Sequence, residues 1–511
     1  MDQLSQEIID TIVSFIPRLV FQKDAPIGKH PPALPVLAAV SQSFQRAAER
    51  LTFKSLYINA TDEELEDFEQ ILNPRRLSNV RTLFIMLPLP CDHIGPAERR
   101  NHHVMELYRQ EDRKATTAPL RRLWNFLGGR NENAAGSGSM RNVSLHLSTE
   151  AADVEDDRNA PRFDFLPLDL TGGVGSFPAL HGIREFKFEN GFRHWNPRVP
   201  AVFTSTMSDA ERVCWELDEA SYDWGRYYSV DKKYRSELVS SFQAMRLPSS
   251  VKDFTCYLKQ PSHRDPGQVL PRFVGNGEHD PVSCAMRELT RDCAKVSLRG
   301  SFHPSLFDPP RSGPGAEEQP CWQQMTRLHV EMALCSPDGS WLFRPETHVL
   351  EDDLPEGLID CTRLPPGYGD TEEELEEAED YYEDHEEIIK PPTKYESNMG
   401  VLVPDDERLN ALLTAFARGC ARMPVLEVAD LRIDYENGQN WPFQVICVQA
   451  AHRLEYWNAD IANDSSLWRV YLHADGWKPT EATLSELKNI GVERNGQPST
   501  ICFLEWGDFY D

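Results

Sequence analysis

The chain has 511 residues, 40% of them hydrophobic, and carries 53 lysines and arginines against 81 aspartates and glutamates, a formal net charge of −28. A chain of this size buries a substantial core, so we expect more than one structural unit. The negative charge repels phosphate backbones and excludes nucleic acid as an expected partner. No apolar run approaches the ~20 residues of a membrane helix, and the acidic N-terminus is unlike a signal peptide. These features predict a cytoplasmic and/or nuclear protein with no membrane partner.

The first sixty residues predict two amphipathic helices. Ser5 is a suitable N-cap for the first helix, and Pro17 is expected near its end. The apolar positions of this helix cover an arc of roughly 180°, which is wider than one core easily covers. The second helix is expected to begin at Pro35, a favoured first position, and to reach Leu51. Such helices need either the following domain or a partner chain to cover their apolar surface.

Three consecutive segments carry a resemblance to a known family. The first two are LSQEIIDTIVSFIP, which starts at Leu4, and LPVLAAVSQSFQRAAERLTFKSLYI, which starts at Leu34. They resemble an F-box, and the following LEDFEQILNPRRLSNVRTLFIMLPLP is similar to the segment after the F-box in filamentous-fungal F-box proteins. Ser5 stands where the family usually has proline, and residues 18–33 separate the helices where the family has a short turn.

The resemblance implies the substrate-recognition subunit of a Skp-cullin-F-box type ubiquitin ligase. F-boxes bind the Skp adaptor, and through it a cullin, by apolar positions of these helices, while the rest of the chain binds a protein substrate. The adaptor-binding residues implied here are Leu4, Ile8, Ile12, Leu37, Val40 and Phe44. The alternative is that these side chains pack against the body of the chain itself.

Beyond residue 60 a short strand pattern recurs, in which apolar residues stand at the first, fourth and sixth positions. Helical stretches at 120–127, 238–245 and 409–420 precede three of the copies. Repeated helix-then-strand units are typical of α/β solenoids, although the spacing here exceeds the ~20–29 residues of leucine-rich repeats. The copies begin at Val80, Met140, Ile183, Val251, Cys293, Met325, Val428, Leu467 and Ile501.

The predicted fold class is therefore α/β. We expect an N-terminal helical F-box at residues 1–58, followed at 59–511 by an irregular leucine-rich-repeat-like solenoid with insertions. The fungal group that the chain resembles contains many such proteins. The alternative is an ordinary α/β domain with a mixed sheet.

Three polar segments, 131–139, 308–319 and 364–400, are expected to be disordered. The last contains the acidic run from Thr371 to Glu387, in which eleven of seventeen residues are acidic. This run either attracts basic substrates or is a solvated insertion without a specific role, and we favour the second interpretation. The aromatic residues between Phe192 and Tyr228 form either a recognition surface, or part of the core or a self-packed loop. Packing in the core is the preferred interpretation, because large aromatic side chains are mostly buried.

The sequence contains no motif typical of a catalytic, nucleotide-binding or metal-binding site. Gly172, Gly173 and Gly175 are not followed by the lysine and serine of a phosphate-binding loop, and His102 and His103 are adjacent rather than spaced for a metal. The eleven cysteines form no CxxC pair. We expect no catalytic, cofactor-binding or metal-binding residues, and hence no enzyme. Two alternatives remain: an enzyme whose groups converge only in the fold, and a scaffold that binds the adaptor without ubiquitin transfer.

Overall fold

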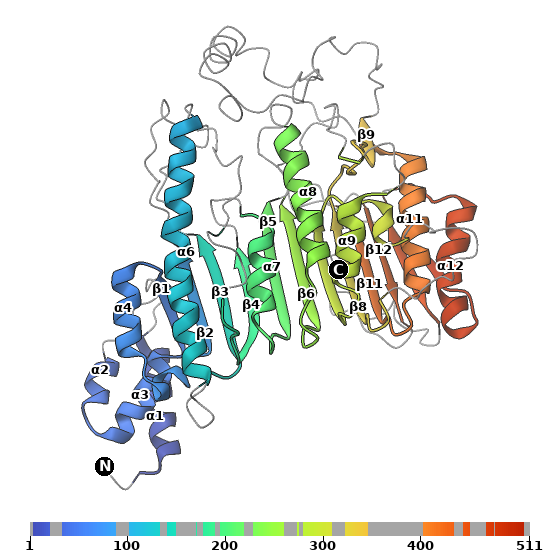
Figure 1. The fold of residues 1–511 in the computed structure, drawn as a ribbon. Helices are drawn as coiled ribbons and strands as arrows, with labels where there is room; N and C mark the ends of the chain where they lie inside the picture. Colours follow the sequence, from blue (N-terminus) through green and yellow to red (C-terminus); the bar gives the residue numbers. More distant parts are fainter. Residues whose placement is uncertain are drawn as a thin grey trace.

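The computed structural model shows an α/β architecture built on one twelve-stranded sheet (Figure 1). The expected acidic insertion at 364–400, and nearly all of the two shorter polar segments, lie outside the described residues. The structure describes residues 4–20, 33–87, 102–132, 140–149, 170, 177–189, 195–218, 228–259, 273–274, 279–308, 322–345, 402–433, 443–449, 467–474 and 476–504.

The strands of the large sheet lie side by side in the order in which they occur along the chain. All neighbours are parallel except β12, which is antiparallel to both β11 and β13. A separate antiparallel pair is formed by β9 (Phe343–Pro345) and β10 (Leu402–Pro404). The twelve strands are β1 (Ser55–Asn59), β2 (Thr82–Leu87), β3 (Val143–Thr149), β4 (Ile183–Glu189), β5 (Arg212–Asp218), β6 (Asp253–Lys259), β7 (Lys295–Gly300), β8 (Arg327–Met332), β11 (Val428–Ile433), β12 (Phe443–Val448), β13 (Arg469–His473) and β14 (Thr500–Leu504).

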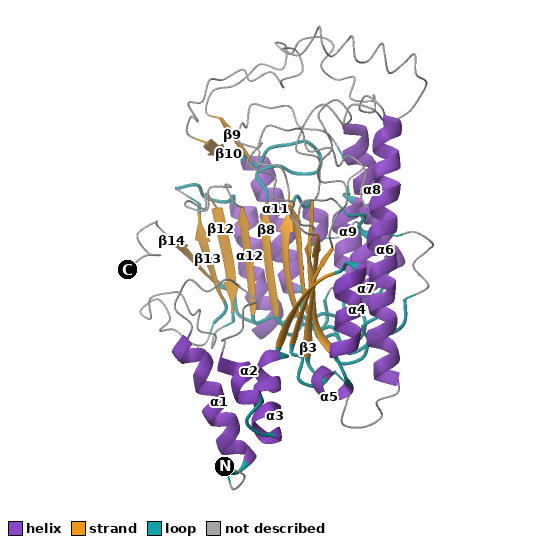
Figure 2. Ribbon diagram, turned by 90° about the vertical axis from the view of Figure 1, so that its left-hand side faces the viewer, coloured by secondary structure: helices purple, strands orange, loops and turns teal. Residues whose placement is uncertain are grey.

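The helices that connect the parallel strands cover one face of the sheet (Figure 2). Parallel strands are joined by right-handed crossovers, so a chain that always steps in the same direction along the sheet places every crossover on the same side. The helices in the described residues are α1 (Gln6–Val20), α2 (Ala33–Ala38), α3 (Gln42–Thr52), α4 (Asp62–Ile71), α5 (Pro74–Leu77), α6 (His102–Glu132), α7 (Arg198–Ser205), α8 (Tyr228–Ala244), α9 (Pro281–Leu289), the short 3₁₀ helix η3 (Pro304–Leu306), α11 (Asp406–Ala421) and α12 (Glu481–Asn495).

A continuous apolar core lies between the sheet and these helices. In β2, for example, Leu83, Ile85 and Leu87 are buried on the helix side, whereas the alternate residues are partly exposed on the opposite face. Large aromatic side chains fill the layer, and the indole of Trp215 is fully buried and donates a hydrogen bond from Nε1 to Thr204 Oγ1 at 3.1 Å. The sheet therefore has one covered face and one face without crossover helices in the described part of the chain.

The strand predictions agree with this sheet at nine places. Each of the nine predicted starts lies within three residues of the start of a strand. The three helical stretches predicted before strands correspond to α6, α8 and α11. Five of the described strands, β1, β5, β9, β10 and β12, were not predicted.

Two predictions about the N-terminal helices are wrong. The first helix does not end at Pro17 but continues to Val20. The second is two helices, because Ser41 adopts an extended conformation and its hydroxyl accepts the backbone N–H of Phe44 at 3.4 Å. Serine competes in this way for backbone groups and starts a new helix, α3, instead of continuing α2.

The residue directly before β4, Gly182, has to be a glycine. Gly182 has φ +79, and a Cβ built there would lie 2.1 Å from the carbonyl oxygen of Met140. We expect Gly182→Ala to lower the free energy of unfolding by about 3 kcal/mol or more, because the left-handed backbone and the clash both oppose a side chain. The control is Gly476→Ala, since Gly476 has φ +82 but nothing within 4 Å of the added Cβ. Its expected loss is about 1 kcal/mol. Equal losses in urea denaturation would contradict the close-contact argument.

Candidate functional site

The three N-terminal helices form a small unit with its own core. α1 and α3 pack through Ile9, Val13 and Phe44, and this cluster is separate from the core of the sheet. Ser5 accepts the backbone N–H of Ile8 at 3.4 Å, as expected for the N-cap of α1. The unit lies at the end of the molecule that holds β1 (Figure 1). The helices end at Thr52 and β1 begins at Ser55, so a domain boundary drawn at residue 58 falls inside the first strand of the sheet.

α1 carries a second apolar face, which points away from this core. Leu4, Ile8, Ile12 and Phe15 fall within an arc of roughly 80° at 100° per residue, and the side formed by Ile9 and Val13 is centred roughly 120° away from it. On α2 and just after it, Val36 and Val40 are also exposed. Between 41% and 69% of each of the six residues is accessible: Leu4, Ile8, Ile12, Phe15, Val36 and Val40. We call these six residues the outer apolar face.

This concentration is unusual within the described part of the chain. The outer apolar face accounts for six of the eleven large hydrophobic residues that are exposed there. The five others, Tyr57, Ile71, Val425, Val492 and Phe503, are distributed over four elements and one loop. A contiguous exposed apolar patch on a folded protein usually marks an interaction site, whereas single exposed apolar residues are ordinary.

The structure divides the six residues implied by the resemblance into two groups. Leu4, Ile8, Ile12 and Val40 lie on the outer apolar face. Phe44 is only 6% exposed and Leu37 packs beside it, so both hold the helices together and offer little surface to a partner. Phe15 and Val36 were not among the implied residues, although both lie in the apolar arcs of the sequence.

Ionic contacts fix the N-terminal helices to the body of the protein. The carboxylate of Glu49 on α3 is buried and accepts hydrogen bonds from Nε and Nη2 of Arg76 at 3.1 and 2.9 Å, and it also pairs with Arg75. The Arg76 guanidinium lies over the Phe53 ring, 5.1 Å from its centroid. Within the helical unit, Arg50 pairs with Asp10. The outer apolar face is thereby held in a defined orientation relative to the sheet.

Glu49→Ala is expected to loosen this attachment without removing the outer apolar face. We expect a loss of about 1–2 kcal/mol, because Glu49 is buried but its arginine partners are partly exposed to solvent. Hydrogen exchange of the α3 amides measures the effect. The matched control is Glu63→Ala, which removes an exposed carboxylate from α4. If α3 is protected equally in both variants, Glu49 is not the attachment point.

Comparison of the chain with protein-family models, with curated proteins and with solved structures gave no match. The outer apolar face therefore has to be interpreted from its own chemistry and from the sequence resemblance.

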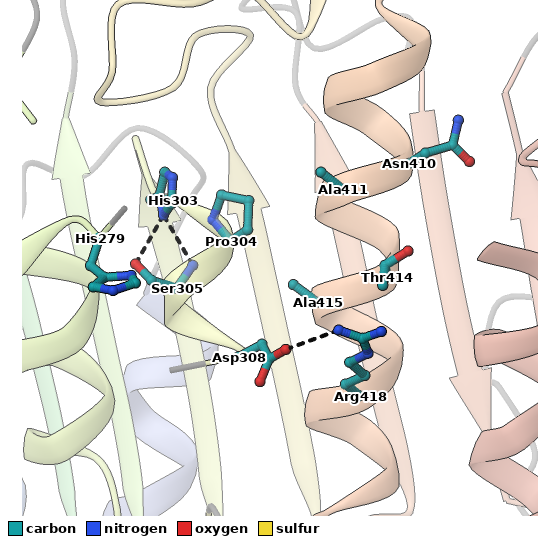
Figure 3. A pocket seen from close by; sticks show the side chains of 10 residues that line it. All are labelled: His279, His303, Pro304, Ser305, Asp308, Asn410, Ala411, Thr414, Ala415 and Arg418. Carbon is teal, nitrogen blue, oxygen red and sulfur yellow. Dashed lines mark hydrogen bonds and ion pairs between the residues drawn. The ribbon is translucent and has the colours of Figure 1, made fainter. Parts of the chain in front are cut away.

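A cavity of about 420 Å³ opens between η3 and α11 (Figure 3). Its wall includes Ser305, which is close to His303 as a catalytic pair would be, with the hydroxyl 3.0 Å from Nδ1. Ser305 is nevertheless buried, and its backbone N–H donates to the same Nδ1 at 3.1 Å, so His303 caps η3. Burial lowers the pKa of His303, which favours the neutral ring that this cap requires.

The charged groups of the same cavity, Arg418 and Asp308, are also engaged by the protein. Arg418 donates to Glu486 at 2.8 Å and lies 3.6 Å from Asp308 (Figure 3). These contacts give the cavity a structural role in joining η3 to α11. In the described residues no group of three His, Cys, Asp or Glu side chains could hold a metal ion.

The structure describes some of the other residues that the sequence analysis considered. Trp195 and Trp215 are fully buried, which supports the packing interpretation for these two aromatic residues. Tyr222, Trp224 and Tyr227 lie outside the described residues. None of the described helices is long and apolar enough to cross a bilayer. The eight cysteines in the described ranges take part in no disulfide.

Proposed function

We propose that the chain is the substrate-recognition subunit of a Skp-cullin-F-box type ubiquitin ligase. The observation that carries the proposal is the outer apolar face, which the N-terminal helices present to solvent while a separate apolar side holds them together. Its position coincides with the segments that resemble an F-box. In this proposal the outer apolar face binds the Skp adaptor, and the body of the chain binds a protein substrate.

The energetics favour a partner for this surface. Full burial of a valine, leucine, isoleucine or phenylalanine side chain contributes ~1.5–3 kcal/mol, so covering the exposed half of each of six residues contributes about 1 kcal/mol per residue. A few such residues at the centre of an interface usually supply most of its affinity. The attachment through Glu49 would then hold the adaptor in a defined position relative to the sheet.

The body fits the proposal as an irregular leucine-rich-repeat-like solenoid with an N-terminal F-box. Sequential parallel strands with their crossover helices on one face support this description. The repeats are irregular, since β8 begins at Arg327 and β11 only at Val428. The antiparallel strand β12 departs from a simple solenoid and agrees with the mixed-sheet alternative at that end.

Co-purification tests the proposal. The tagged full chain, co-expressed with the Skp adaptor and a cullin, is expected to elute with both proteins in one complex. Elution with the adaptor but without the cullin would favour the scaffold alternative, in which no ubiquitin is transferred. A folded chain that never captures the adaptor would refute the assignment.

A further inference from the structure

The sheet face opposite the crossover helices has side chains aligned in rows across the strands. Because the strands are in register, one row runs from Tyr57 on β1 to Phe84 on β2, His146 on β3 and Lys187 on β4. This face differs in character along its length. The first three strands, the middle strands and the last strands are therefore considered separately as binding surfaces.

The middle of the face, on β4 to β8, is charged, and several of its charges are paired with one another. Arg212 lies 3.1 Å from Glu185, and Lys187 lies 3.4 Å from Glu216. Arg299 and Glu331 form a further pair at 3.0 Å. A partner that bound here would have to replace ion pairs that already exist, which offers little gain.

The far end of the face is not accessible. Ile446 on β12, Val448 on β12 and Tyr471 on β13 lie on the same side as the charged rows and are at most 5% exposed. These three side chains offer almost no apolar surface to a partner. Of the three regions of this face, the one on β1, β2 and β3 is therefore both accessible and free of existing ion pairs.

The face of β1, β2 and β3 is uncharged and centred on three adjacent rings. Tyr57 stacks on Phe84 with ring centroids 4.4 Å apart and planes 2° from parallel, and Phe84 lies 4.5 Å from the His146 ring. The tyrosine is 50% exposed. We call these rings and their neighbours the ring patch, which comprises Ser55, Tyr57, Asn59, Thr82, Phe84, Met86, Ser144, His146 and Ser148.

The hydrogen bonds of His146 determine what the ring patch offers to a partner. The Ser144 hydroxyl donates its single hydrogen to Glu185 Oε2 at 3.0 Å. The contact of 2.9 Å between that hydroxyl and His146 Nε2 must then be donated by the imidazole. Nδ1 carries the lone pair in this tautomer and remains as an acceptor. Burial lowers the pKa of His146, which keeps the ring neutral near pH 7.

We propose that the ring patch binds an uncharged segment of a partner protein through one aromatic side chain, which packs across the outward edges of the Tyr57 and Phe84 rings. An indole N–H or a phenol O–H on that side chain donates to His146 Nδ1. The assignment of this partner as the substrate rests on the proposed function, whereas peptide binding itself does not.

The absence of charge on the ring patch favours an uncharged partner segment over an acidic or basic one. The ring patch has no charged side chain with which to pair an acidic or basic group, so burying either kind of group against it is unfavourable. The chain as a whole, at −28, further repels acidic partners. The edges of the rings can still bind an aromatic side chain well, because edge-to-face contacts add to the burial of apolar area.

The test uses a library of random short peptides selected on the full chain. We expect the selected peptides to contain tryptophan or tyrosine flanked by uncharged residues. Tyr57→Ser should raise their dissociation constant at least tenfold, because it removes the most exposed ring. The matched control is Phe503→Ser, which removes a ring of similar exposure, 45%, from β14 at the other edge of the sheet.

A second variant tests the acceptor separately. His146→Phe keeps a ring in the stack and removes Nδ1, so it should weaken tryptophan and tyrosine peptides at least threefold more than the same peptides carrying phenylalanine. Melting temperatures of all variants show that they remain folded. Capture of the Skp adaptor, measured on the same preparations, should be unchanged, which separates failure of the ring patch from failure of the proposed function.

Three results would overturn the proposal: no enrichment of aromatic peptides, enrichment of charged peptides instead, or equal weakening by Tyr57→Ser and Phe503→Ser.

Discussion

Ile8→Asp combined with Val40→Asp is expected to abolish capture of the Skp adaptor while the chain stays folded. Both residues lie on the outer apolar face and are about half exposed, so in the free chain each new carboxylate remains in water. Once the adaptor covers the face, the same carboxylates become buried without a partner, at a cost of several kcal/mol each. Affinity should fall below detection in a pull-down assay.

Matched controls are available elsewhere on the chain. Ile71→Asp and Val425→Asp place carboxylates at residues of similar exposure, 46% and 47%, that lie outside the outer apolar face. Both should retain wild-type capture of the adaptor. Ile9→Asp, in contrast, introduces the charge into the core of the helical unit and should unfold it. If the double variant melts like the wild type and still captures the adaptor, the outer apolar face is not the binding surface.

Several helices and most strands could be predicted because their signals are local. Alternation of apolar residues identifies a strand whose two faces have different surroundings, as in β3, where Val143, Leu145 and Leu147 are buried and the residues between them are not. β12 gives no such signal, since all six of its residues are buried. β5 carries the alternation in Val213 and Trp215, so its signal was present in the sequence and was missed.

The candidate site was predictable only in part for a related reason. Sequence periodicity showed that α1 has too much apolar surface for one core, but it could not assign the two sides. Three-dimensional packing decides that Ile9 faces α3 and Ile8 faces solvent. The burial of Phe44 depends on the break at Ser41, which turns α3 against α1. The ring patch joins residues far apart in the sequence, so only the register of the sheet shows it.

The outer apolar face and the ring patch lie near each other in the fold. The outer apolar face belongs to helices that precede the sheet, and the ring patch belongs to the first three strands, so both lie in the same third of the molecule (Figure 1). Attachment of α3 through Glu49 to the arginines of α5, which precedes β2, gives a short rigid path between them. In a ubiquitin ligase this path would fix a substrate near the adaptor.

Asp280→Ala is expected to cause the largest loss of stability among single changes to polar residues of the body. Asp280 caps α9 and accepts the backbone N–H of Ser283 at 2.9 Å. Its carboxylate also pairs with Arg235 of α8 at 2.8 Å, and both side chains are at most 5% exposed. Removing the carboxylate breaks this buried ion pair, at a cost of about 3–5 kcal/mol. Chemical denaturation monitored by tryptophan fluorescence measures this loss.

The control separates the buried ion pair from the helix cap. Asp405 caps α11 in the same way, accepting the backbone N–H of Arg408 at 3.1 Å, but this bond is exposed. Asp405→Ala should therefore cost only the cap, about 1 kcal/mol. Arg235→Met added to Asp280→Ala should recover part of the larger loss, because it removes the buried charge and fills the space with an apolar side chain of similar length. If Asp280→Ala costs no more than Asp405→Ala, or if Arg235→Met brings no recovery, the pair does not contribute as a buried ion pair.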